Sequence, residues 1–111
     1  MREFLFSYGT LQKTEVQAEL FGRTLIGFPD SLRNYKTTQI EIRNPEFVLK
    51  SAQRLHSIAI RTSDNTDTIT GTALEITPEE LLIADKYEPE EYKRVQVTLD
   101  SGRQAWIYTS A

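Results

Sequence analysis

Ionisable side chains and two tyrosines gather in one short segment, from Asp85 to Arg94. Within it, Glu88 lies between an apolar run that predicts a helix and Pro89, which restricts the local backbone. A carboxylate that is partly buried beside a tyrosine has a raised pKa, which suits a general base near neutral pH. Glu88 is therefore a candidate proton acceptor. The alternative is a solvated acidic loop, which we favour for Glu90 and Glu91.

A second candidate segment is the turn formed by Tyr8, Gly9, Thr10 and Leu11, which follows a run of apolar residues. Glycine gives this turn access to positive φ angles and lets a ligand approach the main chain closely. Successive N–H groups in such a turn can converge on an anion or an oxyanion. The same residues also fit a tight turn without a ligand, so the pattern alone leaves both interpretations open.

The remaining candidates for chemistry are one histidine and several serines. His56 is the only histidine and the chain has no cysteine, so no metal site is predicted, and we interpret His56 as a structural or surface residue. Ser7, Ser51 and Ser57 are available as nucleophiles, but no triad signature accompanies them. The sequence also has no glycine-rich phosphate loop. We therefore expect no cofactor.

The composition is that of one small domain. The chain has 111 residues, 39% of them hydrophobic, which is enough for one core and predicts a single domain over residues 1–111. The absence of cysteine excludes disulfides, thiolate zinc sites and a cysteine nucleophile. No apolar run reaches the length of a membrane span, and the N-terminal apolar stretch is too short for a signal peptide. We expect a cytoplasmic protein that does not bind membranes.

The balance of acidic and basic residues argues against a nucleic-acid partner. Thirteen basic and sixteen acidic residues give a formal net charge of −3, without the basic surface that a phosphate backbone requires. A small β-barrel that binds single-stranded nucleic acid would need a basic groove with interleaved aromatic residues, whereas the basic residues here are scattered and outnumbered. We expect no nucleic-acid partner, and the sequence indicates no particular oligomeric state.

The elements that position the candidate residues follow from apolar spacing and turn signals. Residues 3–7 predict a strand buried on both faces, because the apolar residues are consecutive. Thr14 is the expected N-cap of a short helix, with Gln17 in the capping-box position and Gly22 at the end. Further strands are expected at residues 32–42, 47–49, 58–60 and 69–76, after an extended segment at residues 23–28 and a turn at Pro29-Asp30.

The C-terminal third has the clearest local signals. Thr77 predicts an N-cap, with Pro78 in the first helical position, Glu80 closing a capping box, and an end before Pro89. Residues 92–99 and 104–109 predict an antiparallel hairpin around a tight turn. Gly71 indicates a bulge or a close backbone approach in its strand. Together these elements predict an α+β domain, a small mixed β-barrel or strongly curved sheet of about six or seven strands with two short helices.

Several motifs resemble those of the γ-glutamylcyclotransferase-like superfamily, most nearly the small branch related to γ-glutamylamine cyclotransferase. They are the Tyr-Gly-Thr-Leu segment at the N-terminus, Asp85-x-x-Glu88, and Tyr92-x-Arg94 just beyond it. The similarity extends over nearly the whole chain, including residues 27–30 and 71–76. It implies a mixed-sheet barrel with helices packed around it, and a pocket where the turn at residues 8–11 faces Glu88.

The resemblance also implies roles for individual residues. Residues 8–11 would bind substrate through main-chain groups, Glu88 would be the base, Tyr92 would line the pocket, and Arg94 would hold its strand in register. The chain departs from the pattern at Pro89, where many relatives have glycine. A proline stiffens that loop and removes an N–H donor, so the resemblance does not by itself predict the substrate preference.

The expected activity is cyclisation of a small γ-glutamyl substrate to 5-oxoproline, with release of an amine. The α-nitrogen attacks the γ-carbonyl of the same molecule, so the protein mainly has to fold the substrate, accept a proton and stabilise an oxyanion. Glu88 would accept the proton, and main-chain N–H groups of residues 8–11 would stabilise the oxyanion. The alternative is a non-catalytic module of the same fold that binds a small molecule.

Overall fold

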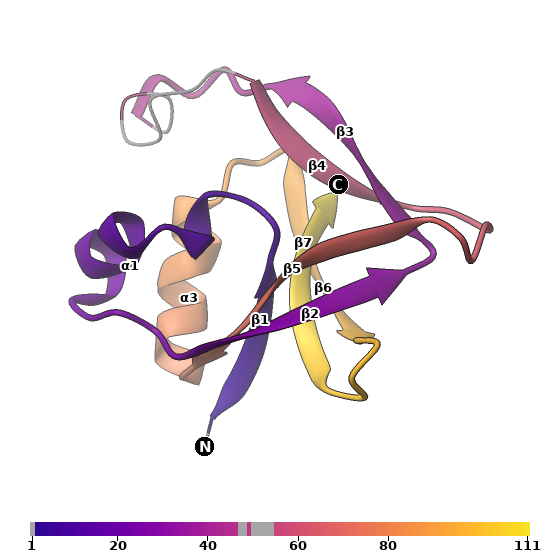
Figure 1. The fold of residues 1–111 in the computed structure, drawn as a ribbon. Helices are drawn as coiled ribbons and strands as arrows, with labels where there is room; N and C mark the ends of the chain where they lie inside the picture. The colour runs from indigo at the N-terminus through magenta and orange to yellow at the C-terminus, as the bar shows by residue number, and fades with distance from the viewer. Residues whose placement is uncertain (1, 47–48, 50–54) are drawn as a thin grey trace.

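The computed structural model describes residues 2–46, 49 and 55–111, which form a strongly curved sheet with helices at one end (Figure 1). The strand order is β2-β5-β1-β7-β4-β3, and β6 pairs with β7 beside this path. This architecture confirms the predicted mixed, curved sheet. The elements in chain order are β1 (Glu3–Ser7), η1 (Thr10–Gln12), α1 (Thr14–Phe21), β2 (Gly27–Arg33), β3 (Tyr35–Glu41), β4 (Leu55–Arg61), β5 (Thr68–Ile76), α3 (Pro78–Tyr87), β6 (Tyr92–Thr98) and β7 (Gln104–Ser110).

Strand β1 is the interior strand that its consecutive apolar residues predict. It pairs antiparallel with β5 and parallel with β7. Successive side chains in a strand point to opposite faces, and here both faces are covered. Leu5 packs in a cluster with the helix residues Val16 and Leu81, whereas Phe6 packs inside the curl of the sheet. The two residues are 0% and 1% exposed.

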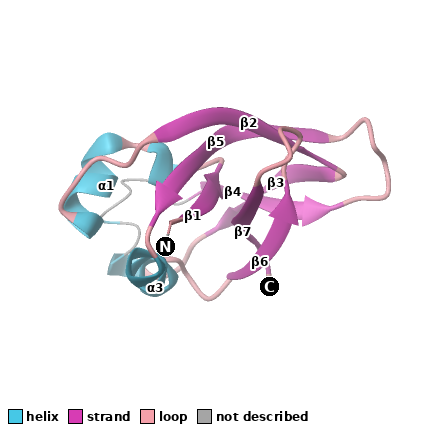
Figure 2. Ribbon diagram, turned by 90° about the horizontal axis from the view of Figure 1, so that it is seen from below, coloured by secondary structure: helices cyan, strands magenta, loops and turns pink. Residues whose placement is uncertain are grey.

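Helices α1 and α3 lie side by side at one end of the sheet in both views (Figures 1 and 2). The predicted capping box at the start of α3 is confirmed: the Thr77 hydroxyl accepts a 3.1 Å bond from the Glu80 N–H, and the Glu80 carboxylate accepts a 3.0 Å bond from the Thr77 N–H. The helix ends at Tyr87, and Glu88 is its C-cap. The position of Glu88 therefore follows from that of α3.

The predicted start of α1 was wrong by one residue. Its N-cap is Lys13, which makes no side-chain capping bond, and Thr14 is already helical. Gln17 is not part of a capping box. Its buried side-chain amide donates a 2.7 Å bond to the Leu11 carbonyl and accepts a 2.9 Å bond from the Leu25 N–H. Gln17 thus fixes the end of the turn at residues 8–11 to the helix, a role that local sequence does not indicate.

The predictions for β2 and β3 also require correction. Pro29 and Asp30 lie within β2, not in a turn, and Pro29 pairs with Thr72 of β5. A proline is tolerated there because β2 is an edge strand and has no further strand to which it must donate. The strand expected over residues 32–42 is divided at Asn34, which has a φ of 66°. The strand expected at residues 47–49 lies outside the described residues except for Leu49.

The other strand predictions are confirmed. Strands β6 and β7 form the antiparallel hairpin, with Tyr92 opposite Ser110, and β7 also pairs with β1. Gly71 marks a close backbone approach, because a Cβ atom there would collide with the main-chain oxygen of Ser7. Within the described part of the chain, no helix is long and apolar enough to cross a membrane.

Candidate active site

A pocket of about 360 Å³ opens beside the end of β1 and brings the predicted site residues together. Glu88 and Tyr92 line it together with the turn at residues 8–11, as expected if the two motifs share one cavity. The residues that complete its lining are Leu5, Phe6, Ser7, Gln12, Lys13, Gln39, Leu55, His56, Ser57 and Tyr108.

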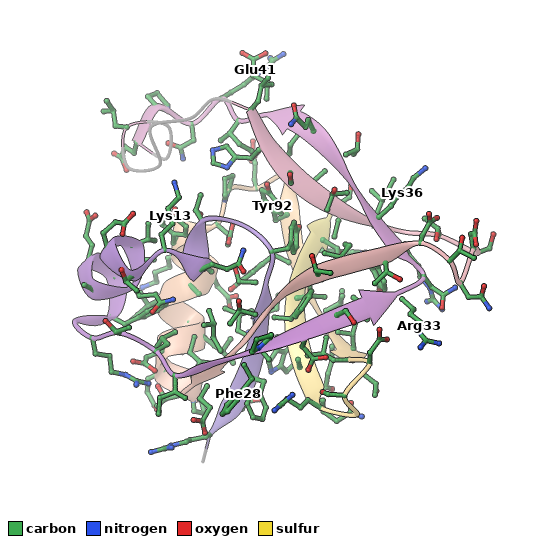
Figure 3. The ribbon with its side chains drawn as sticks, viewed as in Figure 1. Lys13, Phe28, Arg33, Lys36, Glu41 and Tyr92 are labelled. Carbon is green, nitrogen blue, oxygen red and sulfur yellow. The ribbon has the colours of Figure 1, made fainter. Side chains whose placement is uncertain are left out.

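Four elements, β1, η1, α3 and β6, position the predicted residues of this pocket. Strand β1 ends at Ser7, and η1 begins at Thr10 after two turn residues. Glu88 follows α3 directly, and Tyr92 is the first residue of β6. Figure 3 shows the Tyr92 side chain in the space between the η1 turn and strand β4. The Tyr92 hydroxyl donates a 2.9 Å hydrogen bond to the Ser57 carbonyl of β4, which fixes this wall.

Glu88 is the acidic side chain of this pocket, and its protonation is strongly perturbed. Burial raises the pKa of its carboxyl group from an ordinary 4.5 to about 8, and the negative charge of Asp85 adds to the effect. Within the described residues, no group donates a hydrogen bond to its carboxyl oxygens. A carboxyl group that exchanges its proton near neutral pH and has no internal donor is able to act on a bound molecule.

The hydroxyl groups around Glu88 mostly hold the pocket walls together. The Tyr8 hydroxyl donates a 2.6 Å bond to the Tyr108 carbonyl and accepts a 2.8 Å bond from the Ala59 N–H. The hydroxyls of Thr10 and Tyr87 lie 3.0 Å apart. Burial raises the pKa of Tyr8 well above its usual range, so its hydroxyl stays protonated. Because its hydroxyl is already used in the pocket wall, we expect Tyr8 to contact a ligand through its main chain.

The turn itself differs from expectation in one respect. Gly9 has a φ of −138° and does not use the positive φ that the sequence suggested. The first hydrogen bond within η1 runs from the Gln12 N–H to the Gly9 carbonyl, at 3.1 Å. The N–H groups of Thr10 and Leu11 come before Gln12 in the chain, so they have no carbonyl partner within η1.

Among the residues of the pocket that sequence reasoning missed, His56 and Tyr108 are both buried. His56, interpreted as structural or surface, is buried and lines the pocket. Its position two residues before the buried Ile58 was the available signal, because strand residues two apart share a face. Tyr108 is also buried there, and no local pattern indicates it. Ser7 and Ser57 line the pocket as well, whereas Ser51 lies outside the described residues.

Asp85 and Arg94 form an ion pair next to the pocket. The Arg94 guanidinium donates to both Asp85 carboxyl oxygens, at 2.7 and 2.9 Å, and lies 4.4 Å from the centre of the Trp106 ring. The pair ties β6 to α3, which is a broader role than holding β6 in register. Among the described residues, no three His, Asp or Glu side chains gather as metal ligands.

Comparisons with known proteins bear on the family and the fold of this chain. Residues 5–111 match the family model described as gamma-glutamyl cyclotransferase, AIG2-like. A solved structure named gamma-glutamyl cyclotransferase aligns with a TM-score of 0.76 at 13% identity, over 100% of this chain and 68% of that chain. A search of curated proteins found no match.

Two further solved structures share the fold. A protein from Arabidopsis thaliana has a TM-score of 0.70 and 20% identity over 99% of this chain. An uncharacterized human protein has a TM-score of 0.70 and 15% identity over 99% of this chain. This chain spans 62% of the length of that Arabidopsis protein and 67% of the human one.

Proposed function

The chain belongs to the family of AIG2-like gamma-glutamyl cyclotransferases, and from this we propose that it converts a small γ-glutamyl compound into 5-oxoproline and an amine, with Glu88 as general base. The observation that carries the proposal is the shared pocket. Glu88, with a pKa raised to about 8, lines the same cavity as the turn at residues 8–11. The pocket volume of about 360 Å³ is adequate for a glutamyl group.

The first proposed step activates the substrate nitrogen. A γ-glutamyl group carries an α-ammonium and a γ-carbonyl on one short chain. Ionised Glu88 accepts a proton from the ammonium, and the freed nitrogen attacks the γ-carbonyl carbon to close a five-membered ring. Because both reacting groups belong to one molecule, holding the chain in a folded conformation provides much of the acceleration.

The second step releases the amine. The attack creates a tetrahedral carbon whose oxygen becomes negative, and the N–H groups of Thr10 and Leu11 would stabilise that charge. The α-nitrogen gives up two protons in all, and the departing nitrogen gains two as its bond to the carbon breaks. Glu88 would transfer them, accepting each from the α-nitrogen and donating it to the amine.

The experiment that tests this proposal measures product and binding separately. The purified protein is incubated with γ-glutamyl amines and γ-glutamyl dipeptides, 5-oxoproline is measured by chromatography, and binding is followed by thermal shift. Glu88→Gln keeps the shape of the side chain but cannot accept a proton. We expect it to lose about 10²- to 10⁴-fold in rate while still binding the ligand.

Glu90→Gln is the matched control, because Glu90 is an exposed carboxylate of the same loop, and its rate should equal that of the wild type. Full activity of Glu88→Gln would show that Glu88 is not the base. A wild-type protein that is stabilised by a γ-glutamyl compound but forms no 5-oxoproline would instead be the binding module considered above.

A further inference from the structure

A second pocket, of about 390 Å³, adjoins the candidate active site and shares Glu88, Tyr92 and Tyr108 with it. Its other lining residues are Asp85, Arg94 and Trp106. Glu88 therefore lies where the two pockets meet. The second pocket adds one carboxylate to the surroundings of Glu88, and that carboxylate belongs to Asp85.

Asp85 is held in place by residues from two strands. Arg94 of β6 donates two hydrogen bonds to its carboxylate, at 2.7 and 2.9 Å. The Tyr108 hydroxyl of β7 donates a third, at 2.7 Å. Arg94 is restrained in turn by stacking on the Trp106 ring. A carboxylate with three donors has few alternative positions, so its charge stays at one location.

The helix brings this fixed charge close to Glu88. Asp85 lies in the last turn of α3, and Glu88 caps that turn three residues later. Residues three apart on a helix are neighbours on its surface. We propose that Asp85 is a positioning residue for Glu88: its carboxylate, held by Arg94 and Tyr108, sets how tightly Glu88 holds a proton. The catalytic consequence rests on the proposed role of Glu88 as the base.

The two carboxylates have opposite protonation behaviour. Hydrogen bonds from Arg94 lower the pKa of Asp85, so Asp85 stays ionised. Burial, and after it the charge of Asp85, raises the pKa of Glu88. Two acidic groups whose pKa values are pushed apart in this way can divide their tasks. Asp85 supplies a permanent negative charge, and Glu88 exchanges the proton.

Other titratable groups also face Glu88, and they come from each side of the site. Four tyrosine hydroxyls surround it, all with raised pKa values and therefore neutral: Tyr8, Tyr87, Tyr92 and Tyr108. Lys13 and His56 line the first pocket, and Arg94 lines the second. A comparison of Asp85→Asn with the wild type keeps all these groups and removes only the charge of Asp85.

The test is an NMR pH titration of the Glu88 side-chain carboxyl carbon in protein labelled with ¹³C-glutamate. For Asp85→Asn, which retains an acceptor for Arg94 and Tyr108, we expect the Glu88 midpoint to fall by about one pH unit. For Arg94→Gln, which leaves Asp85 less neutralised, we expect the midpoint to rise. Glu90→Gln, the matched loss of a nearby carboxylate, should leave it unchanged.

The pH dependence of kcat/KM provides the second readout. The acid limb should move in the same direction as the Glu88 midpoint in each variant. A reduced rate with an unmoved midpoint and limb would show that Asp85 only supports the fold, and would overturn the proposal. If Asp85→Asn does not fold, the double variant Asp85→Asn/Arg94→Gln, which leaves neither charge of the ion pair unpaired, is used instead. Both it and Arg94→Gln lack the charge of Arg94, so a lower Glu88 midpoint in the double variant would support the effect of Asp85, and equal midpoints would overturn the proposal.

The titration also separates this proposal from the proposed function, because it needs no turnover. Midpoints that shift as expected in a protein inactive on every γ-glutamyl compound would support the coupling and contradict the activity. Turnover that requires Glu88, combined with a midpoint that is the same in all variants, would support the activity and contradict the coupling.

Discussion

The hydroxyl group of Tyr8 donates a 2.6 Å hydrogen bond to the main-chain oxygen of Tyr108 and accepts a 2.8 Å bond from the N–H of Ala59. Tyr8 follows β1, Tyr108 lies in β7 and Ala59 in β4. The parallel pairings of β7 are short, with Leu5 opposite Trp106 on one side and Ala59 opposite Thr109 on the other. One hydroxyl thus reinforces the sheet where its ladder is shortest, at the edge of the pocket.

Removal of this hydroxyl should destabilise the protein. In Tyr8→Phe the Ala59 N–H, in a residue that is 0% exposed, loses its partner, as does the Tyr108 carbonyl. We expect the free energy of unfolding to fall by about 1–3 kcal/mol, measured by urea denaturation. Tyr35→Phe is the control, because the described residues give the Tyr35 hydroxyl no hydrogen bond, and it should change stability by less than about 0.5 kcal/mol. Equal effects would contradict this role of Tyr8.

The raised pKa of Glu88 determines the expected pH dependence of activity. Glu88 accepts a proton only when ionised, and its pKa is raised to about 8. Below that pH, kcat/KM should fall about tenfold for each unit. The measurement is the initial rate of 5-oxoproline release over about four pH units, from about pH 5.5 to about pH 9.5. An acid limb near an ordinary glutamate pKa would mean that Glu88 is solvated and would contradict its burial.

The same pKa has a consequence for stability. Because folding raises the pKa of Glu88 from 4.5 to about 8, the folded protein holds this proton more tightly than the unfolded chain. Stability is therefore lost as the pH rises from about 4.5 to about 8, by at most about 1.4 kcal/mol for each pH unit. Glu88→Gln removes this term, so the variant should be a few kcal/mol more stable than the wild type at pH 8 to 9.

Thermal unfolding of both proteins across this pH range provides the measurement. The difference in Tm should be largest at alkaline pH and shrink toward the ordinary glutamate pKa, where both chains carry a neutral group. A difference that does not vary with pH would show that packing and not ionisation separates the two proteins.

Local signals predicted the fold where one short segment contained all the necessary information. The capping box of α3 depends only on Thr77 and Glu80, and its geometry is as expected. The errors arose where tertiary structure overrode local preference. Pro29 is a residue type typical of turns, but it lies in the edge strand β2, which tolerates a proline. Asn34 is an exception, because it has a positive φ, which asparagine adopts more often than most residues. That local signal was overlooked within the strand prediction.

The candidate site was predictable only in part, for a similar reason. Glu88 and the turn at residues 8–11 each have a recognisable motif, and the resemblance to a family linked them. Tyr108 reaches the pocket because β7 lies between β1 and β4, and a single sequence does not contain that strand order. The fixed charge of Asp85 likewise depends on a donor from that strand. Side chains whose role depends on strand order require the structure.

Two glycines offer a test that separates binding from folding. Gly71 lies against the main chain of Ser7, where a Cβ atom would collide with the carbonyl oxygen and approach the Phe6 ring to 3.0 Å. Gly9 lines the pocket, and a Cβ atom there would meet no protein atom within 4 Å. Gly71→Ala should therefore destabilise the protein by about 1–3 kcal/mol, whereas Gly9→Ala should change stability by less than about 0.5 kcal/mol.

The effects on activity should be the reverse. If substrate contacts the main chain of the turn at residues 8–11, the added methyl group of Gly9→Ala holds the γ-carbonyl away from the N–H donors. A displacement of about 1 Å is enough to cost up to about 100-fold in kcat/KM. Gly71→Ala, assayed well below its Tm, should keep its rate because Gly71 does not line the pocket. The measurements are Tm and kcat/KM for both variants. A Gly9→Ala protein with wild-type kinetics would show that substrate does not approach this turn, and the oxyanion donors would then have to be sought elsewhere in the pocket.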